Sequence, residues 1–209
     1  RRGVDTRRPR AMYWQAEGDA QAELKVKLEC HQRGIALYQG LGDTWRQANM
    51  LVWAGELSNR LGLPDLALQS LQEALRLARQ LGEPHTILYS LRQLAYTNFV
   101  ANRVEVARQL MQETAAYLEG VAEVPLRATA QMHLGVQRIW SAHFTDGIRS
   151  LESAIPQLRN LGYRNGVCFG SVALGIGLVL NGEYPRSQAV LTALIPDAEQ
   201  GGSPREAAV

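Results

Sequence analysis

Several residue types are scarce in this 209-residue sequence, and each scarcity excludes a class of protein. The two cysteines, Cys30 and Cys168, lie far apart in the chain, so we expect no disulfide framework and a reducing, cytoplasmic setting. No signal peptide is recognisable. The longest apolar run, residues 172–180, is about half as long as a membrane-spanning helix must be. The sequence therefore predicts no membrane partner.

Lysine is almost missing. The 22 basic residues include only Lys25 and Lys27 as lysines, and the net charge is +2. The arginines gather into no stripe, so we expect no direct contact with nucleic acid. Neither lysine follows a glycine-rich turn, which means that a phosphate loop, and any ATPase module that depends on one, lies outside this segment.

Candidates for catalysis or metal binding are equally few. None of the four histidines stands at ligand spacing from another histidine or from a cysteine, so we expect no metal and no cofactor. No serine or cysteine has recognisable partners for nucleophilic attack, and an enzyme is the least favoured class. The glycines near the C-terminus lie in a helical pattern with no strand before them, which favours close packing over a nucleotide site: Gly166, Gly170, Gly175 and Gly177.

The most informative feature is a repeat. The stretch 62–82 recurs along the chain at an offset of forty residues without any insertion. Small residues share one position of this repeat, and large apolar residues follow four positions later: Ala67, Ala107, Gly147 and Ser187, then Leu71, Met111, Leu151 and Leu191. A helical repeat of this length predicts a solenoid, in which each unit packs only against its neighbours.

The repeat also predicts the domain organisation. Residues 1–19 are expected to form a linker and a truncated first helix, over 11–17, that ends at Gly18 and Asp19. Residues 20–198 form the repeat domain, with an irregular helix over 20–39 and regular repeats at about 43–82, 83–122, 123–162 and 163–202. Each repeat holds two antiparallel helices. The tail 199–209 reads as the start of a further repeat, with Ser203 before Pro204 as a helix N-cap, so we expect an excised segment of a longer protein.

The positions conserved between these units resemble the tetratricopeptide repeat (TPR). That family places Leu-Gly in the first helix, Gly near its end, and Ala, a large residue and Ala in the second. The third regular unit has Leu134-Gly135, Gly147, Leu151 and Ala154, and the fourth has Leu174-Gly175, Gly182, Ser187, Leu191 and Leu194. The first has Ala54-Gly55, Gly62, Ala67, Leu71 and Ala74, and the second has Leu94-Ala95, Asn102, Ala107, Met111 and Thr114. Leu and Met replace most of the family's aromatic residues, and the unit is longer than the usual one.

The end of the second helix resembles that of one subgroup of this family. It carries Ala74-Leu75, Leu77, Arg79 and Leu81-Gly82. This pattern resembles the sensor region of signal-transduction ATPases with numerous domains (STAND), a group that includes LuxR-type and maltose-activator-like regulators. The resemblance implies that a small inducer, a protein or a peptide binds the repeats, and that a nucleotide-binding module of the same polypeptide is released from autoinhibition.

The resemblance also implies a ligand site on the inner face, lined by first-helix positions spaced three, four and three apart. The four sets are Asn49, Val52, Glu56 and Asn59; Tyr89, Arg92, Tyr96 and Phe99; Thr129, Met132, Val136 and Ile139; and Phe169, Val172, Ile176 and Val179. From these sets and Arg60 we predict the ligand-binding residues Asn49, Glu56, Arg60, Tyr89, Arg92, Tyr96, Phe99, Met132, Val136, Phe169, Val172 and Ile176.

The two ends of this predicted groove differ in chemistry. At the polar end, Arg92 lies a turn from Tyr89 and from Tyr96, and could hold an anionic or aromatic group of a ligand. At the apolar end, the strip is either a contact site or a surface that another repeat or domain covers.

Taken together, we expect an all-α, right-handed solenoid of about five antiparallel helix pairs. The leading functional hypothesis is a ligand- or protein-binding sensor segment of a larger cytoplasmic signalling ATPase or transcriptional regulator. The alternative is a general interaction scaffold whose parent contains no such ATPase.

Overall fold

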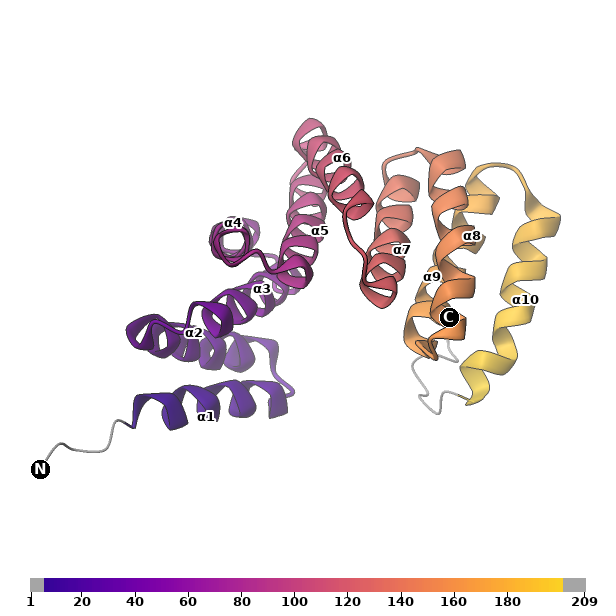
Figure 1. The fold of residues 1–209 in the computed structure, drawn as a ribbon. Helices are drawn as coiled ribbons and strands as arrows, with labels where there is room; N and C mark the ends of the chain where they lie inside the picture. Colours follow the sequence, from indigo (N-terminus) through magenta and orange to yellow (C-terminus); the bar gives the residue numbers. More distant parts are fainter. Residues whose placement is uncertain (1–5, 201–209) are drawn as a thin grey trace, which may run out of the picture. The chain divides into compact units, whose positions relative to one another are not determined.

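A computed structural model of the chain describes the backbone of residues 6–200 and the side chains of residues 6–195. The described part contains ten α-helices and no strand (Figure 1), which confirms the predicted all-α solenoid. The helices are α1 (Arg7–Ala20), α2 (Leu24–Leu41), α3 (Thr44–Arg60), α4 (Pro64–Leu81), α5 (Pro84–Val100), α6 (Val104–Glu119), α7 (Val124–Trp140), α8 (Phe144–Asn160), α9 (Arg164–Leu180) and α10 (Tyr184–Gln200). The expected further repeat from Ser203 lies outside the described residues.

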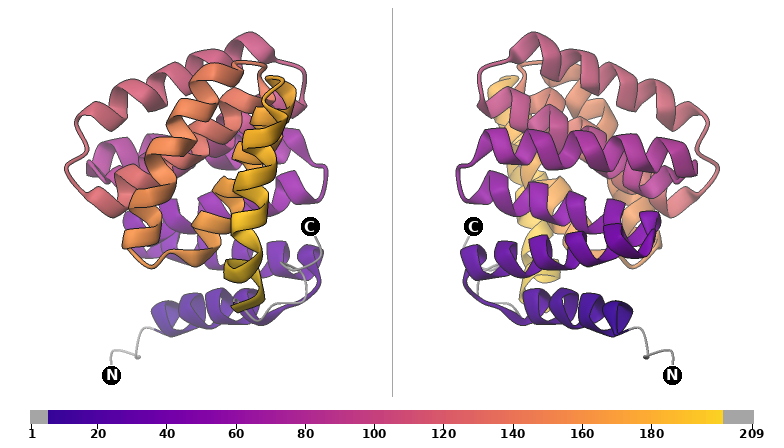
Figure 2. Two further views of the ribbon diagram at one scale, coloured as in Figure 1. Left: turned by 90° about the vertical axis from the view of Figure 1, so that its right-hand side faces the viewer. Right: turned by 90° about the vertical axis from the view of Figure 1, so that its left-hand side faces the viewer.

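The chain divides into two compact units between Leu110 and Met111, inside α6. Within each unit, successive helices run back and forth against each other (Figure 2). In the first unit each helix from α1 to α5 packs on the next, and α3 also packs on α5. In the second unit α7 to α10 pack in the same order, and α7 also packs on α9. The first helices of successive repeats, α3 with α5 and α7 with α9, are therefore neighbours in space.

Glycines in the odd-numbered helices let the paired helices approach closely. A Cβ atom at Gly55, in α3, would lie 2.5 Å from Cγ of Leu71 in α4. The same relation recurs 80 and 120 residues further along the chain, at 2.8 Å for Gly135 with Leu151 and 2.8 Å for Gly175 with Leu191. The leucine side chain fills this space, so a side chain larger than that of glycine does not fit at the facing position. The predicted packing role of the helical glycines is confirmed; Gly170 and Gly177 likewise lie against Met132 and Ile139.

The turns that end α3, α5, α7 and α9 share one backbone conformation. Their left-handed residues are Gly62, Asn102, Ala142 and Gly182, with φ of 72°, 58°, 63° and 83°. In each turn the N–H of the following residue donates to the carbonyl five residues before it, as from His143 to Arg138 at 2.8 Å. This is a Schellman C-cap, which normally takes glycine at the left-handed position. Ala142 is therefore strained, whereas Gly62 and Gly182 at the equivalent position are not.

The first helix differs from its prediction. It begins at Arg7 rather than near residue 11 and continues through Gly18 to Ala20, and α2 begins only at Leu24. Gly18 was expected to end the helix, but it is buried, and a Cβ there would lie 2.5 Å from Cδ2 of His31 in α2. Tight contact with α2 thus outweighs the low helix propensity of glycine.

No helix in the described part of the chain is both long and apolar enough to cross a bilayer. The two cysteines are free thiols; Cys30 is buried in α2 and Cys168 is half-buried in α9.

Candidate functional site

In the first unit, side-chain hydrogen bonds join the neighbouring helices α3 and α5. Three of the four donors on α5 are buried, and the acceptors on α3 are half-buried. The bonds run from Thr86 to Asn49 (3.2 Å), from Tyr89 to Glu56 (2.9 Å), from Gln93 to Glu56 (3.1 Å) and from Thr97 to Asn59 (3.0 Å), with Tyr89 itself half-buried. We call this set the α3–α5 ladder. Hydrogen bonds to a charged acceptor are stronger than those between neutral groups, so the two bonds to Glu56 are the strongest of the α3–α5 ladder.

Glu56 is held by two donors on one of its oxygens. The Tyr89 hydroxyl and the Gln93 amide both donate to Oε2. Among the described residues Oε1 accepts no hydrogen bond, so the carboxylate is oriented while one oxygen keeps its full acceptor capacity. Burial, followed by the charge and hydrogen bond of Glu56, raises the pKa of Tyr89 to about 12, although Arg92 acts in the opposite direction. Tyr89 therefore remains a hydrogen-bond donor at neutral pH.

The ring of Tyr89, whose hydroxyl donates to this carboxylate, lies against a guanidinium group and a second aromatic ring. The Cζ atom of Arg92 lies 4.2 Å from the ring centroid of Tyr89. The ring of Trp53 lies 5.7 Å from that of Tyr89, tilted by 48°, and 49% of Trp53 is exposed. We call Trp53, Glu56 and Tyr89 the Trp53 surface. An exposed tryptophan beside a fixed polar group is typical of binding surfaces, where such residues often dominate the binding energy.

Trp53 was missed from the sequence, which favoured Val52 instead. The structure buries Val52, with 4% exposed. The exposed edge of α3 follows Trp45, Asn49, Trp53 and Glu56, and Trp45 is 51% exposed. The spacing of two tryptophans by eight residues on one helix face could have revealed this edge.

The other predicted residues of the first unit lie on the same two helices. Asn49 and Glu56 belong to the α3–α5 ladder, and Tyr89 and Arg92 stack on each other. Arg60 is exposed at the end of α3, and Tyr96 and Phe99 are half-buried on α5. The structure thus brings together Glu56, Tyr89 and Arg92. Ligand binding by these residues stays a prediction.

In the second unit two predicted residues require correction. Met132 and Val136 are each only 2% exposed and belong to the hydrophobic core between α7, α8 and α9. A Cβ atom at Gly170 would lie 3.2 Å from Cγ of Met132, so α9 covers this part of α7 directly. Neither side chain can line an open groove, because the next odd-numbered helix packs on it.

The apolar strip of the second unit is therefore confined to α9. Phe169 is 45% exposed, Ile176 48% and Val179 43%, with Val172 half-buried between them. The ring of Phe169 lies 5.8 Å from that of His133, which is half-buried on α7.

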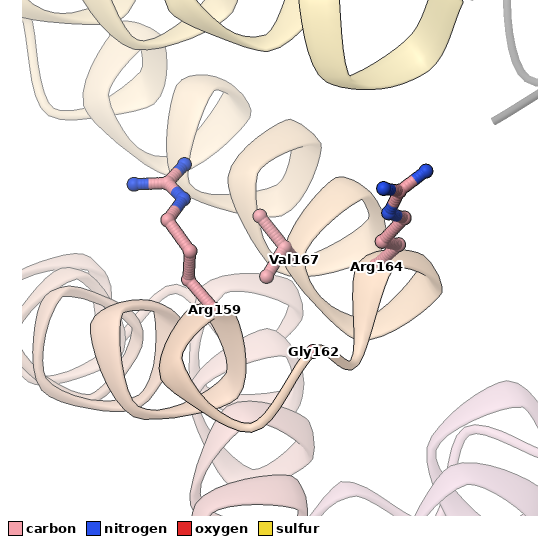
Figure 3. Close-up of a pocket in the computed structure, with 4 residues that line it drawn as sticks. All are labelled: Arg159, Gly162, Arg164 and Val167. Carbon is pink, nitrogen blue, oxygen red and sulfur yellow. The ribbon is translucent and has the colours of Figure 1, made fainter. Parts of the chain in front are cut away.

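A small cavity lies where α8 turns into α9. It has a volume of about 250 Å³ and is lined by Arg159, Gly162, Arg164 and Val167. Figure 3 shows the two arginine side chains on either side of Val167. Guanidinium groups placed in this way suit an anion, but nothing in the sequence analysis anticipated this cavity. Within residues 6–195, no three His, Cys, Asp or Glu side chains gather to hold a metal ion.

Comparison with known proteins rests on structure, because no family model matches the sequence and no curated protein matches it. The chain is similar to a protein of Podosopora anserina described as a kinesin light chain with nearly identical TPR-like repeats. The identity is 14%, the TM-score is 0.68, and the match covers 96% of this chain and 100% of that one. The fold is TPR-like.

Two further TPR-like matches come from larger proteins. A Rap protein complexed with competence and sporulation factor has a TM-score of 0.75 at 12% identity, over 91% of this chain and 52% of that one. A STAND protein with a tetratricopeptide repeat sensor, from Pyrococcus horikoshii, has a TM-score of 0.67 at 16% identity, over 91% of this chain and 30% of that one. The chain thus spans about half of the Rap protein and less than a third of the STAND protein. At these identities the likeness shows the fold alone.

Proposed function

We propose that this chain is the ligand- or protein-binding sensor segment of a larger cytoplasmic signalling ATPase or transcriptional regulator. The observation that carries the proposal is the Trp53 surface, where a half-exposed indole lies beside an oriented carboxylate on two helices. Its groups are held in place before a ligand arrives, which lowers the ordering cost of binding. The likeness to a STAND protein with a TPR sensor and to a Rap protein complexed with a signalling factor supports this proposal.

The proposed mechanism is a population shift. A protein, a peptide or a small inducer that contacts both α3 and α5 favours the helix arrangement in which the α3–α5 ladder is closed. A nucleotide-binding module in the same polypeptide would respond to that arrangement. The ligand acts only through the difference between its affinities for the two arrangements. Catalysis by the segment itself is not part of the proposal.

The alternative is a scaffold that binds a partner protein without signalling. The exposed apolar strip on α9 favours it, since contiguous apolar surface of this kind commonly marks a protein contact. The two functions differ in the parent polypeptide. A phosphate-loop module in the same chain, whose nucleotide hydrolysis changes when the repeats bind their ligand, supports the sensor; its absence leaves the scaffold.

The first experiment is a thermal-shift screen of this chain against metabolites, nucleotides and peptides, run beside a pull-down from the source cytoplasm. We expect a saturable rise in melting temperature that is lost when Trp53→Ala and Tyr89→Ala, both on the Trp53 surface, are combined. Arg127→Ala is the matched control, because Arg127 is exposed on α7 in the other unit. Stabilisation that survives the double substitution would contradict the proposed site, and the absence of any ligand or partner would contradict the function.

A further inference from the structure

Three aromatic rings of the first unit are paired with cations of the same chain. The Cζ of Arg33 lies 4.5 Å from the ring centroid of Trp14, that of Arg46 lies 5.9 Å from Trp45, and that of Arg92 lies 4.2 Å from Tyr89. Trp53 is 49% exposed, and no cation of the described residues stacks on it. Tryptophan is the ring that attracts cations most strongly, so this open indole is the position best suited to a cation from outside the chain.

The carboxylate of Glu56, next to Trp53, also favours a cation. Trp53 and Glu56 are three residues apart on α3, which places them on one side of the helix, and both contact Tyr89. Tyr89 and Gln93 both donate to Oε2 of Glu56, and in the described part of the chain Oε1 accepts no hydrogen bond. A group that carries N–H donors and a positive charge would satisfy this oxygen with a charge-assisted hydrogen bond.

We propose that the Trp53 surface binds a basic side chain, an arginine or a lysine, of a partner polypeptide. The cation lies against the Trp53 indole and donates to Oε1 of Glu56. Tyr89 and Gln93 hold the carboxylate in place through Oε2. This inference rests on the proposed function and names the chemistry that its ligand presents.

An anionic ligand fits this position less well. Arg92, the nearest candidate to receive an anion, already lies on the ring of Tyr89, and Tyr89 donates to Glu56. An anion placed at Arg92 would therefore lie close to the Glu56 carboxylate and be repelled by it. The experiment below therefore includes an anionic peptide, whose binding would support the earlier expectation that Arg92 holds an anionic group.

The experiment uses four blocked pentapeptides, Gly-Gly-X-Gly-Gly, in which X is arginine, lysine, citrulline or glutamate. Binding to the ¹⁵N-labelled chain is followed at the indole N–H resonance of Trp53, assigned by its loss in Trp53→Leu. We expect saturable shifts with arginine and lysine and none with citrulline, which has the shape of arginine without its charge. Equal binding of citrulline, binding of the glutamate peptide, or no shift with any peptide would overturn the proposal.

Two variants complete the test. Glu56→Gln keeps an amide oxygen to accept from Tyr89 but loses the charge, and we expect it to weaken the arginine peptide about tenfold or more. Trp45→Leu is the control, because Trp45 lies on the same helix and is already paired with Arg46; it should leave the affinity unchanged. A true partner that binds the chain equally well after Glu56→Gln would remove this inference and leave the proposed function intact.

Discussion

Gly55 and Leu71 occupy one space between α3 and α4: a Cβ on the glycine would lie 2.5 Å from Cγ of the leucine. Real Cβ atoms do not approach carbon so closely, so any side chain at position 55 must displace Leu71, which is completely buried. The pair recurs at Gly135 with Leu151 and at Gly175 with Leu191, and in these repeats it defines how closely the two helices can pack.

We expect Gly55→Ala to lower the free energy of unfolding by about 1–3 kcal/mol, the usual cost of overpacking a filled core. Gly40→Ala is the matched control, because Gly40 lies in α2 with nothing within 4 Å of the added Cβ. That change should raise stability by about 0.5–1 kcal/mol through helix propensity. Urea denaturation followed by circular dichroism measures both. Equal effects of the two substitutions would refute the packing role of Gly55.

Ala142→Gly should stabilise the chain. Ala142 has a φ of 63°, a conformation that costs a residue with a Cβ about 1 kcal/mol or more. Glycine removes that strain, although the greater freedom of the unfolded chain offsets part of the gain. We expect a net gain of about 0.5–1 kcal/mol in urea denaturation. Gly182→Ala, at the equivalent turn with a φ of 83°, should be destabilising, and a neutral result there would contradict the explanation.

Burial of Tyr89, together with the charge and hydrogen bond of Glu56, makes stability depend on pH in the alkaline range. The folded pKa of Tyr89 is about 12, above the ordinary value of 10.0. The contribution is therefore complete below pH 10 and is lost as the pH rises from 10 to 12. After discounting for partial exposure to solvent, we expect a loss of about 1–2 kcal/mol over that interval.

Tyr89→Phe separates the contribution of Tyr89 to the pH dependence of stability from that of the other tyrosines. The variant lacks the donor to Glu56, so it should be less stable than the parent chain near neutral pH by about 1–2 kcal/mol. The difference between the two chains should shrink between pH 10 and pH 12. A difference that stays constant up to pH 12 would show that the hydroxyl does not titrate as described.

Met132→Ala tests whether Met132 belongs to the core of the second unit. Met132 is 2% exposed in the core, so its truncation should cost about 2–5 kcal/mol of unfolding free energy. Ile176→Ala, on the exposed strip of α9, should cost less than about 1 kcal/mol, because Ile176 is 48% exposed. Chemical denaturation of the two variants separates core from surface. Similar costs at both positions would contradict the assignment.

The repeat made much of the fold predictable. The helices α3 to α10 fall into four pairs, and the first helices of these pairs begin forty residues apart, at Thr44, Pro84, Val124 and Arg164. The close contacts of Gly135 and Gly175 follow from the same spacing. The first helix was less predictable, because Gly18 is a helix-ending signal in isolation and becomes a packing residue only when His31 lies against it.

The candidate site was predicted only in part. Glu56, Tyr89 and Arg92 were expected on adjoining helices, and their contacts join α3 to α5. Trp53 was not predicted. Met132 and Val136 were expected on an open surface, but both are buried in the structure.

The sequence alone determined the all-helical repeat, the positions of its turns and the faces on which helices pair, because these depend on local spacing along the chain. Only the tertiary structure decided which residues of an inner face remain exposed. Equivalent positions differ in exposure, as Val136 and Ile176 do at 2% and 48%, because exposure depends on what the neighbouring helix covers. That neighbour is set by the packing of whole repeats, and no pattern within a single helix records it.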